Sequence, residues 1–205
     1  FGAQINTVAF ASASTYFIGT GEGIFRTSDT GATWQVKNNG MTAASTDEIV
    51  ITNAPEKIIV AKYGKGYFVS ADKGVTWAFN ALSNYVSKVL KLTDGTILLY
   101  GQGYILRSTD NGATFSTDNI YRNSNQKIIE ASNGDLYTFY SLYVNPNYVQ
   151  KIAKSTNKGS TWTDLTITGL PTASNAYVTE AAIDISNNIM FHGRFSNICV
   201  TSRRK

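Results

Sequence analysis

Four copies of one eight-residue pattern constrain the fold of this chain more than any other feature. The pattern is Ser/Thr-x-Asp/Asn-x-Gly-x-Thr-Trp/Phe, and it recurs at intervals of 43, 38 and 47 residues. The copies are Thr27–Trp34, Ser70–Trp77, Ser108–Phe115 and Ser155–Trp162. Repeats with a period of about 20–50 residues are typical of solenoids and propellers, in which one supersecondary unit is stacked several times. The spacing therefore predicts a repeat protein.

Each copy has the residues of a tight turn between two strands. Gly74 occupies the position at which a short hairpin loop needs a positive φ, which glycine reaches without steric cost. The Asp72 carboxylate can accept hydrogen bonds from the backbone N–H groups that follow it, and the hydroxyls of Ser70 and Thr76 can link the two arms. Asn157 replaces the acid in the fourth copy, so the position needs a hydrogen-bond acceptor more than a charge.

The aromatic residue that ends each copy begins the next strand, where it can bury about 150–250 Å² against a neighbouring sheet. We therefore expect the turn residues to be structural: Asp29, Gly31, Trp34, Asp72, Gly74, Trp77, Asp110, Gly112, Phe115, Asn157, Gly159 and Trp162. Calcium binding or catalysis by these aspartates is the less favoured alternative.

The pattern resembles the Asp-box, also called the bacterial neuraminidase repeat. The Asp-box occurs in sialidases, other glycoside hydrolases, sortilin-type receptors and photosystem II assembly factors. In these families it lies between the third and fourth strands of a β-propeller blade, on the rim and away from the functional face. The resemblance covers nearly the whole chain and implies an all-β propeller, but it says little about function because one fold serves many activities.

Short apolar segments separate the turns, and each repeat holds four of them. In the second repeat they are Glu48–Ile51, Lys57–Val60, Tyr67–Val69 and Thr76–Phe79. The sequence thus predicts one propeller domain over residues 1–205, with four-stranded antiparallel blades at about 6–40, 45–82, 86–119, 126–167 and 177–205. The connection Ser141–Tyr148 in the fourth blade is the largest departure from the repeat, and we expect it to be an enlarged loop.

The fifth repeat contains only three predicted strands, Ala182–Ile185, Ile189–His192 and Asn197–Val200. Two interpretations stay open. Either the chain is cut from a larger propeller, or Phe1–Ile5 supplies the missing strand and closes a five-bladed ring, which would protect the sheet edges. A start at Phe1 without Met predicts a mature product or an excised piece.

Composition excludes several classes of function. The net charge of +4 comes from scattered Lys and Arg residues, and no nucleic-acid-binding signature is present. No apolar run reaches the roughly 18 residues of a membrane span. His192 is the only histidine, which argues against a His-rich metal site, and we expect no metal and no cofactor. The Ser/Thr/Asn-rich, cysteine-poor composition favours a secreted or cell-envelope protein.

Strand order places the candidate ligand face at the end of the blades opposite the Asp-box turns. In a four-stranded meander, the connections from the second to the third strand and from one blade to the next share this end, and such variable loops commonly carry binding sites. The candidate ligand-binding residues there are Tyr63, Lys65, Tyr104, Arg122, Tyr143, Tyr148, His192 and Arg194, with Tyr85 among the other loop residues. Ordinary solvated loops have a similar composition.

The first strands of the five repeats align into one column of residues: Phe10, Val50, Lys91, Glu130 and Asp184. The favoured interpretation is an ion-pair network, because buried charges are tolerated when they are paired. The alternative is an acid/base pair formed by Glu130 and Asp184, with Lys91 shifting their pKa values. Both interpretations predict that the side chains of Lys91 and Glu130 lie within about 8 Å of each other.

The resemblance to Asp-box families suggests two functional hypotheses. Sialidases carry an arginine in a Phe/Tyr-Arg-Ile/Leu-Pro motif, and none of Pro55, Pro146 and Pro171 follows such a motif. An arginine-rich patch like that of the photosystem assembly factors is not evident either. We therefore favour a noncatalytic extracellular propeller that binds carbohydrate or protein, or a structural part of a larger surface protein, completed by other domains or chains. The alternative is a fragment of an Asp-box glycoside hydrolase, more similar to xyloglucanases than to sialidases.

Overall fold

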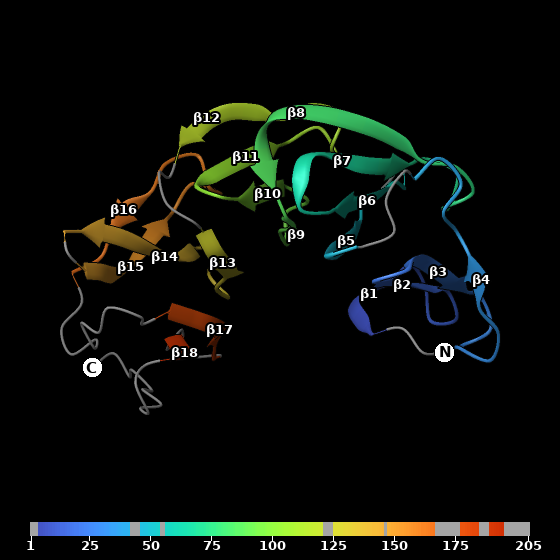
Figure 1. The fold of residues 1–205 in the computed structure, drawn as a ribbon, viewed down its shortest axis with the longest axis horizontal. Helices are drawn as coiled ribbons and strands as arrows, with labels where there is room; N and C mark the ends of the chain where they lie inside the picture. The colour runs from blue at the N-terminus through green and yellow to red at the C-terminus, as the bar shows by residue number, and fades with distance from the viewer. Residues whose placement is uncertain are drawn as a thin grey trace. The chain divides into compact units, whose positions relative to one another are not determined.

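The computed structural model describes residues 4–41, 46–53, 56–120, 125–145, 147–166, 177–184 and 189–194. The regular secondary structure in these ranges consists entirely of β-strands (Figure 1). The strands form four four-stranded antiparallel sheets, and in each sheet the strands lie side by side in chain order. The prediction of an all-β chain built from four-stranded antiparallel blades is confirmed.

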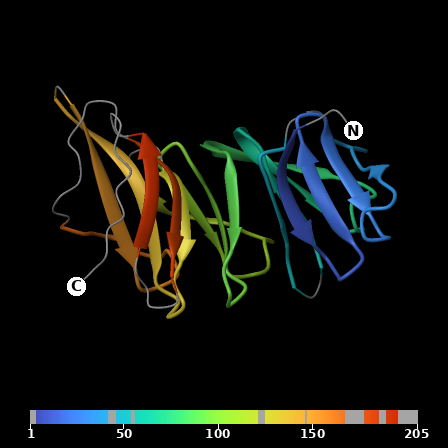
Figure 2. The same cartoon turned by 90° about the horizontal axis from the view of Figure 1, so that it is seen from below.

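The first two sheets correspond to the first two predicted blades. The first sheet consists of β1 (Ile5–Phe10), β2 (Tyr16–Thr20), β3 (Gly23–Thr27) and β4 (Gln35–Val36). The second consists of β5 (Glu48–Ile51), β6 (Ile58–Ala61), β7 (Gly64–Ser70) and β8 (Ala78–Val86). Figure 2 shows the four blue strands of the first sheet as one layer.

The remaining strands follow the same order. The third sheet consists of β9 (Lys88–Lys91), β10 (Ile97–Gly101), β11 (Tyr104–Ser108) and β12 (Ser116–Ile120). The fourth consists of β13 (Asn125–Glu130), β14 (Leu136–Val144), β15 (Asn147–Ser155) and β16 (Thr163–Asp164). A two-stranded sheet of β17 (Tyr177–Ile183) and β18 (Ile189–Arg194) completes the described residues.

The chain divides into two compact units, residues 1–101 with 106–116 and residues 102–105 with 117–205. The core of the first unit is organised by β6, whose four residues are all buried. Because side chains alternate between the two faces of a strand, Ile58 and Val60 pack in one cluster with residues of the first sheet. Ile59 and Ala61 pack in a second cluster with residues of the third sheet. The apolar run in the sequence therefore reflects burial on both faces.

Both faces of the first sheet are apolar. Ala9, Phe17 and Ile24 pack against the second sheet. Strand register places Val8, Ile18, Phe25 and Val36 in one row across the opposite face. On that face the Tyr16 ring lies 5.3 Å from the Phe10 ring and 5.6 Å from the Trp34 ring, between ring centroids, and Val8, Phe10 and Val36 are exposed. Such a composition is typical of a sheet face that packs against another layer.

The Asp-box turns share one hydrogen-bond pattern. In the second turn, Asp72 Oδ1 accepts from the Ser70 hydroxyl at 2.7 Å and from the Thr76 backbone N–H at 2.8 Å. The Ser70 Oγ in turn accepts from the Gly74 N–H at 2.8 Å. In the fourth turn Asn157 Oδ1 accepts from the Thr161 N–H at 2.8 Å, so the amide serves as well as the carboxylate.

One feature of these turns was not predicted from the sequence. Gly74 has φ +81°, as its position requires, but the residue before the glycine also has a positive φ in every copy. These residues are Thr30 at 60°, Lys73 at 58°, Asn111 at 60° and Lys158 at 58°. Among them only asparagine is a residue type that readily adopts this conformation, so the hydrogen bonds of the Asp-box hold the other three in place.

The three acidic Asp-boxes are expected to make stability pH-dependent. Hydrogen bonds from the hydroxyl and N–H of Thr33, Thr76 and Thr114 lower the pKa values of Asp29, Asp72 and Asp110 from 3.8 to about 2. A carboxylate with a lowered folded-state pKa stabilises the fold above its unfolded-state pKa, near 4, and this stabilisation is lost as the pH falls toward 2. The urea midpoint should therefore fall between pH 4 and pH 2.

The fourth turn supplies the control for this experiment, because Asn157 does not titrate. The triple variant Asp29→Asn, Asp72→Asn, Asp110→Asn should lose most of the decline between pH 4 and pH 2, and Asn157→Asp should steepen it. An equally steep decline in the triple variant would show that other groups cause the acid sensitivity.

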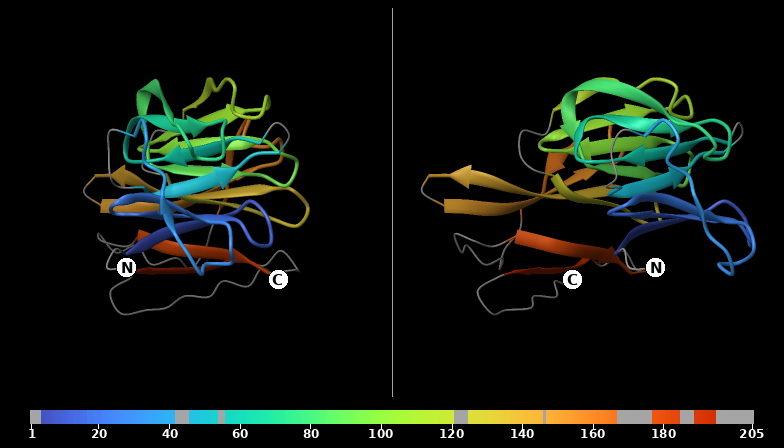
Figure 3. Two further views of the ribbon diagram at one scale, coloured as in Figure 1. Left: turned by 90° about the vertical axis from the view of Figure 1, so that its right-hand side faces the viewer. Right: turned by 45° about the vertical axis from the view of Figure 1, so that its right-hand side comes forward.

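The structure differs from the sequence prediction at two further places. Ser141–Tyr148 is not an enlarged loop: β14 and β15 remain paired up to Val144 and Asn147, as a ribbon that extends beyond the strand pairings of β13 and β16 (Figure 3). Ile5 is the first residue of β1 and pairs with Thr20 in the first sheet, so it does not complete the fifth blade. Phe1–Ala3 and the predicted strand Asn197–Val200 lie outside the described residues, and ring closure stays a prediction.

Candidate functional site

The structure brings together two of the predicted ligand-face residues, Tyr63 and Lys65, with Tyr85 at the end of β8. The centroids of the Tyr63 and Tyr85 rings are 5.6 Å apart, with the ring planes tilted by 37°. The Lys65 ammonium lies 5.2 Å from the centroid of the Tyr85 ring. We call Tyr63, Lys65 and Tyr85 the tyrosine cluster.

A break in strand register positions the cluster. Gly66 pairs with Ala81, but Gly64 pairs with Val86, so β8 has extra residues opposite the start of β7. Tyr85 lies in this bulged stretch, and bulges of this kind re-aim side chains at the rims of sheets. The position of Tyr63 is fixed by its backbone N–H, which donates to Asp47 Oδ2 at 2.7 Å just before β7 begins.

Gly66 allows β7 and β8 to approach each other beside the cluster. A Cβ atom at this position would lie 2.3 Å from Cζ of Phe79 and 2.6 Å from the Asn80 carbonyl oxygen. The Phe79 ring therefore covers the glycine, and it also contacts Phe68 with ring centroids 5.1 Å apart. A larger residue at Gly66 would move the strand that carries Tyr85.

The tyrosine cluster is accessible to a ligand. Tyr63 is 55% exposed and Tyr85 is 38% exposed. An aromatic ring offers an apolar face that can stack on the C–H face of a sugar or on an apolar side chain, while a tyrosine hydroxyl and an ammonium add hydrogen-bond donors. The cluster thus combines stacking surface with polar groups. The contact between Tyr85 and Tyr63 could not be predicted from the sequence, because it results from the shift in register between β7 and β8.

The other predicted ligand-face residues belong to the second unit, and a place for them beside this cluster stays a prediction. Tyr104 begins β11, and Tyr143 pairs with Tyr148 in the β14–β15 ribbon, where Tyr143 is 54% exposed. His192 and Arg194 lie in β18, and nothing beyond their backbone positions is described. Arg122 lies outside the described residues.

Two members of the charged column, Glu130 and Lys91, have described polar contacts, and the acid/base pair of Glu130 and Asp184 stays a prediction. Glu130 Oε1 forms an ion pair with Lys158 Nζ at 3.5 Å, and Lys91 Nζ donates to Asn53 Oδ1 at 3.3 Å. Lys91 and Glu130 belong to different units, and their adjacency stays a prediction. Asp184 directly follows β17 and is half-buried. At the same level of the first sheet, Phe10 is 71% exposed.

No group of three or more His, Cys, Asp and Glu side chains among the described residues could hold a metal ion. None of the described segments is a helix long and apolar enough to cross a membrane.

No protein-family model matches the sequence, and no curated protein matches it. Among solved structures, the chain is similar to YCF48 bound to D1 peptide, with a TM-score of 0.63 and 14% identity over 93% of this chain and 61% of that chain. It is also similar to the extracellular domain of a two component system from B. thetaiotaomicron, with a TM-score of 0.68 and 15% identity over 93% and 26% of the two chains. A GH74 xyloglucanase from Xanthomonas campestris gives a TM-score of 0.65 and 15% identity over 87% and 33%.

At these identities the likeness shows the fold and not the function. The fold is that of Asp-box propeller proteins, in agreement with the resemblance of the four turns. The chain spans 61%, 26% and 33% of the three solved structures, which is less than two thirds of each.

Proposed function

We propose that this chain is a noncatalytic, extracellular or cell-envelope binding module, and that its tyrosine cluster binds a carbohydrate. The observation that carries the proposal is the exposed pair of rings at Tyr63 and Tyr85, with the Lys65 ammonium held over one of them. The likeness to an extracellular domain supports the location.

A sugar suits the chemistry of the cluster. The two tilted rings offer apolar faces to the C–H groups of a pyranose, and Lys65 can donate to its hydroxyls or pair with a carboxylate. A protein ligand is the second candidate, because exposed tyrosines beside a lysine also suit a peptide, and the YCF48 structure contains a bound peptide.

Tyr85→Ala and Tyr63→Ala are each expected to weaken glycan binding about tenfold. A lost aromatic stacking contact is worth about 0.5–1.5 kcal/mol beyond the buried area, and a tenfold loss of affinity corresponds to about 1.4 kcal/mol. A glycan array followed by calorimetry on the best ligand provides the measurement. Phe10→Ala is the matched control, because Phe10 is an exposed aromatic residue on the first sheet, away from the cluster, and its loss should leave affinity unchanged.

Other results would favour the remaining hypotheses. Saturable binding of a peptide library member that depends on Tyr85 would replace the carbohydrate with a protein ligand. No saturable binding, together with a self-association that Phe10→Asp abolishes, would favour a structural part of a larger protein, as the apolar outer face of the first sheet suggests. Turnover of a glycoside panel that is lost in Glu130→Gln or Asp184→Asn would favour the hydrolase fragment.

A further inference from the structure

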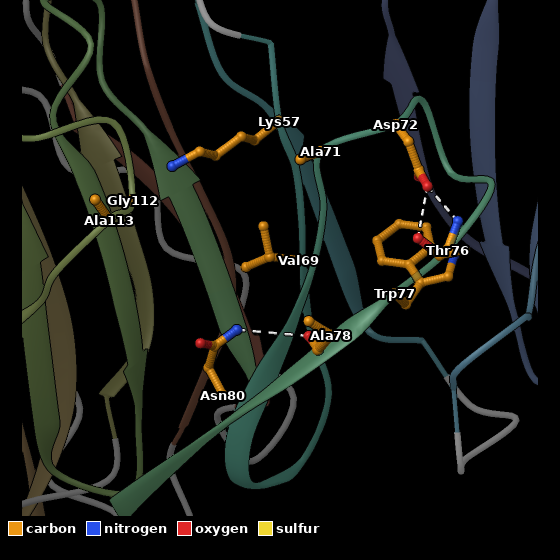
Figure 4. Close-up of a pocket in the computed structure, with 10 residues that line it drawn as sticks. All are labelled: Lys57, Val69, Ala71, Asp72, Thr76, Trp77, Ala78, Asn80, Gly112 and Ala113. Carbon is orange, nitrogen blue, oxygen red and sulfur yellow. Dashed lines mark hydrogen bonds between the residues drawn. The ribbon is translucent and has the colours of Figure 1, made fainter.

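A cavity of about 580 Å³ opens between the second and third Asp-box turns of the first unit (Figure 4). Its lining comes from the residue that precedes β6, from β7 and β8, and from both turns: Lys57, Val69, Ala71, Asp72, Thr76, Trp77, Ala78, Asn80, Gly112 and Ala113. Ligand pockets typically have volumes of about 300–1,000 Å³. This cavity lies at the Asp-box end, whereas the tyrosine cluster lies at the opposite end of the second sheet.

The repeat explains why there is space at this junction. Four lining residues are smaller than their counterparts at the junction of the first and second sheets: Val69, Ala78, Asn80 and Ala113 correspond to Arg26, Gln35, Lys37 and Val75. The aromatic position also differs. Trp77 donates from Nε1 to the Lys37 carbonyl at 2.7 Å, whereas Phe115 has no such donor and packs edge-on against Tyr67, with ring centroids 5.1 Å apart.

The charge of the lining is also specific to this junction. The residue that precedes the Asp-box is Arg26, Arg107 or Lys154 in the other copies and Val69 here. In the fourth sheet, Lys154 forms an ion pair with Asp135 at 2.6 Å. By strand register Lys57 takes the place of Asp135, since Ile58 pairs with Ser70 as Leu136 pairs with Ser155. In the second sheet, Lys57 and Val69 thus occupy the positions that the ion-paired Asp135 and Lys154 occupy in the fourth sheet.

The Lys57 side chain carries a cation into the cavity (Figure 4). Among the described residues, no carboxylate lies within ion-pair distance of its ammonium group. The Asp72 carboxylate in the lining is already engaged by Ser70 and Thr76. Figure 4 shows the Lys57 side chain extended across the cavity toward Gly112 and Ala113. Asn80 Nδ2 makes only a long bond of 3.5 Å to the Ala78 carbonyl, which leaves its amide able to bind a ligand.

We propose that this cavity binds a small organic carboxylate with a compact ring body. The Lys57 ammonium pairs with the carboxylate, and the Asn80 amide donates a second hydrogen bond. The methyl groups of Val69, Ala71 and Ala113 provide apolar contacts for the ring. Charge-assisted hydrogen bonds to a carboxylate are about twice as strong as neutral ones, so the negative charge should decide which ligands bind.

The test uses four probes on the full chain: benzoate and D-glucuronate as carboxylates, and benzyl alcohol and D-glucose as their neutral counterparts. Binding is followed by amide chemical shifts in two-dimensional NMR spectra. At least one carboxylate should bind at least tenfold more tightly than its neutral counterpart and shift the amides of Gly112 and Ala113. Lys57→Met should weaken this binding at least tenfold, and Lys57→Arg should restore most of it.

Two controls make the result decisive. Lys73→Met removes an exposed cation from the second Asp-box turn, which borders the cavity, but Lys73 is not part of the cavity lining. This variant should leave binding unchanged. Tyr85→Ala should leave the carboxylate-induced shifts of the Gly112 and Ala113 amides unchanged, so the failure of this proposal and the failure of the tyrosine-cluster proposal can be told apart. Equal binding of charged and neutral probes, no binding of either carboxylate, or unchanged carboxylate affinity in a folded Lys57→Met variant would overturn the proposal.

Discussion

Replacing Trp77 with alanine should lower the free energy of unfolding by about 3–5 kcal/mol, the usual cost of truncating a buried large aromatic residue. Trp77 is only 5% exposed and belongs to the core cluster shared by the first two sheets. Its indole N–H also donates to the Lys37 carbonyl at 2.7 Å. One side chain from the second sheet thus contributes both apolar contact and a hydrogen bond to the first.

Trp77→Phe separates these two contributions, because Phe115 shows that the repeat accepts phenylalanine at this position. The variant retains most of the buried ring but leaves the Lys37 carbonyl without its donor, which should cost about 1–3 kcal/mol. Urea unfolding curves of the wild type and both variants provide the measurement. If Trp77→Ala were as stable as Trp77→Phe, the packing of the two sheets would not depend on this ring.

The propeller fold could be predicted because its signals are local and repeated. The Asp-box fixes a turn by contacts within eight residues, and the short apolar runs between the turns fix the strands. The exact bounds of β5, Glu48–Ile51, were predicted in this way. The last strand of each blade was less predictable: β4 is only two residues long and β8 is nine, since the length of an outer strand depends on how far it remains paired with its neighbour.

The candidate sites depend on interactions that a sequence does not display. Loop position correctly suggested Tyr63 and Lys65 as surface residues, but their contact with Tyr85 results from the register shift between β7 and β8. The cavity beside Lys57 went unpredicted because the Asp-box end was interpreted as purely structural. A signal was present all the same: Val69 replaces the cation that precedes the other three Asp-boxes.

The pair Gly40 and Gly95 provides a test of how closely the first two sheets must approach. The two glycines have nearly the same backbone conformation, with φ +89° and φ +91°. They differ in what surrounds them. A Cβ atom at Gly40 would lie 2.4 Å from the Trp77 carbonyl oxygen, whereas at Gly95 the nearest atom would be Asn53 Nδ2 at an ordinary 3.6 Å. Because the Trp77 N–H also donates to the Asn39 carbonyl at 3.0 Å, this backbone contact has little freedom to widen.

Gly95→Ala should therefore cost about 1–2 kcal/mol, the penalty of a left-handed conformation for a residue with a Cβ atom. Gly40→Ala should cost the same penalty plus about 1–3 kcal/mol for overpacking against a fixed backbone. The difference between the two unfolding free energies thus isolates the close approach of the Asn39–Gly40 segment to Trp77. Combining Gly40→Ala with Trp77→Ala should then cost less than the sum of the two single changes, because both act on one contact and neighbouring changes are not additive. Equal effects of Gly40→Ala and Gly95→Ala, or strict additivity with Trp77→Ala, would mean that this segment and Trp77 stabilise the two sheets independently.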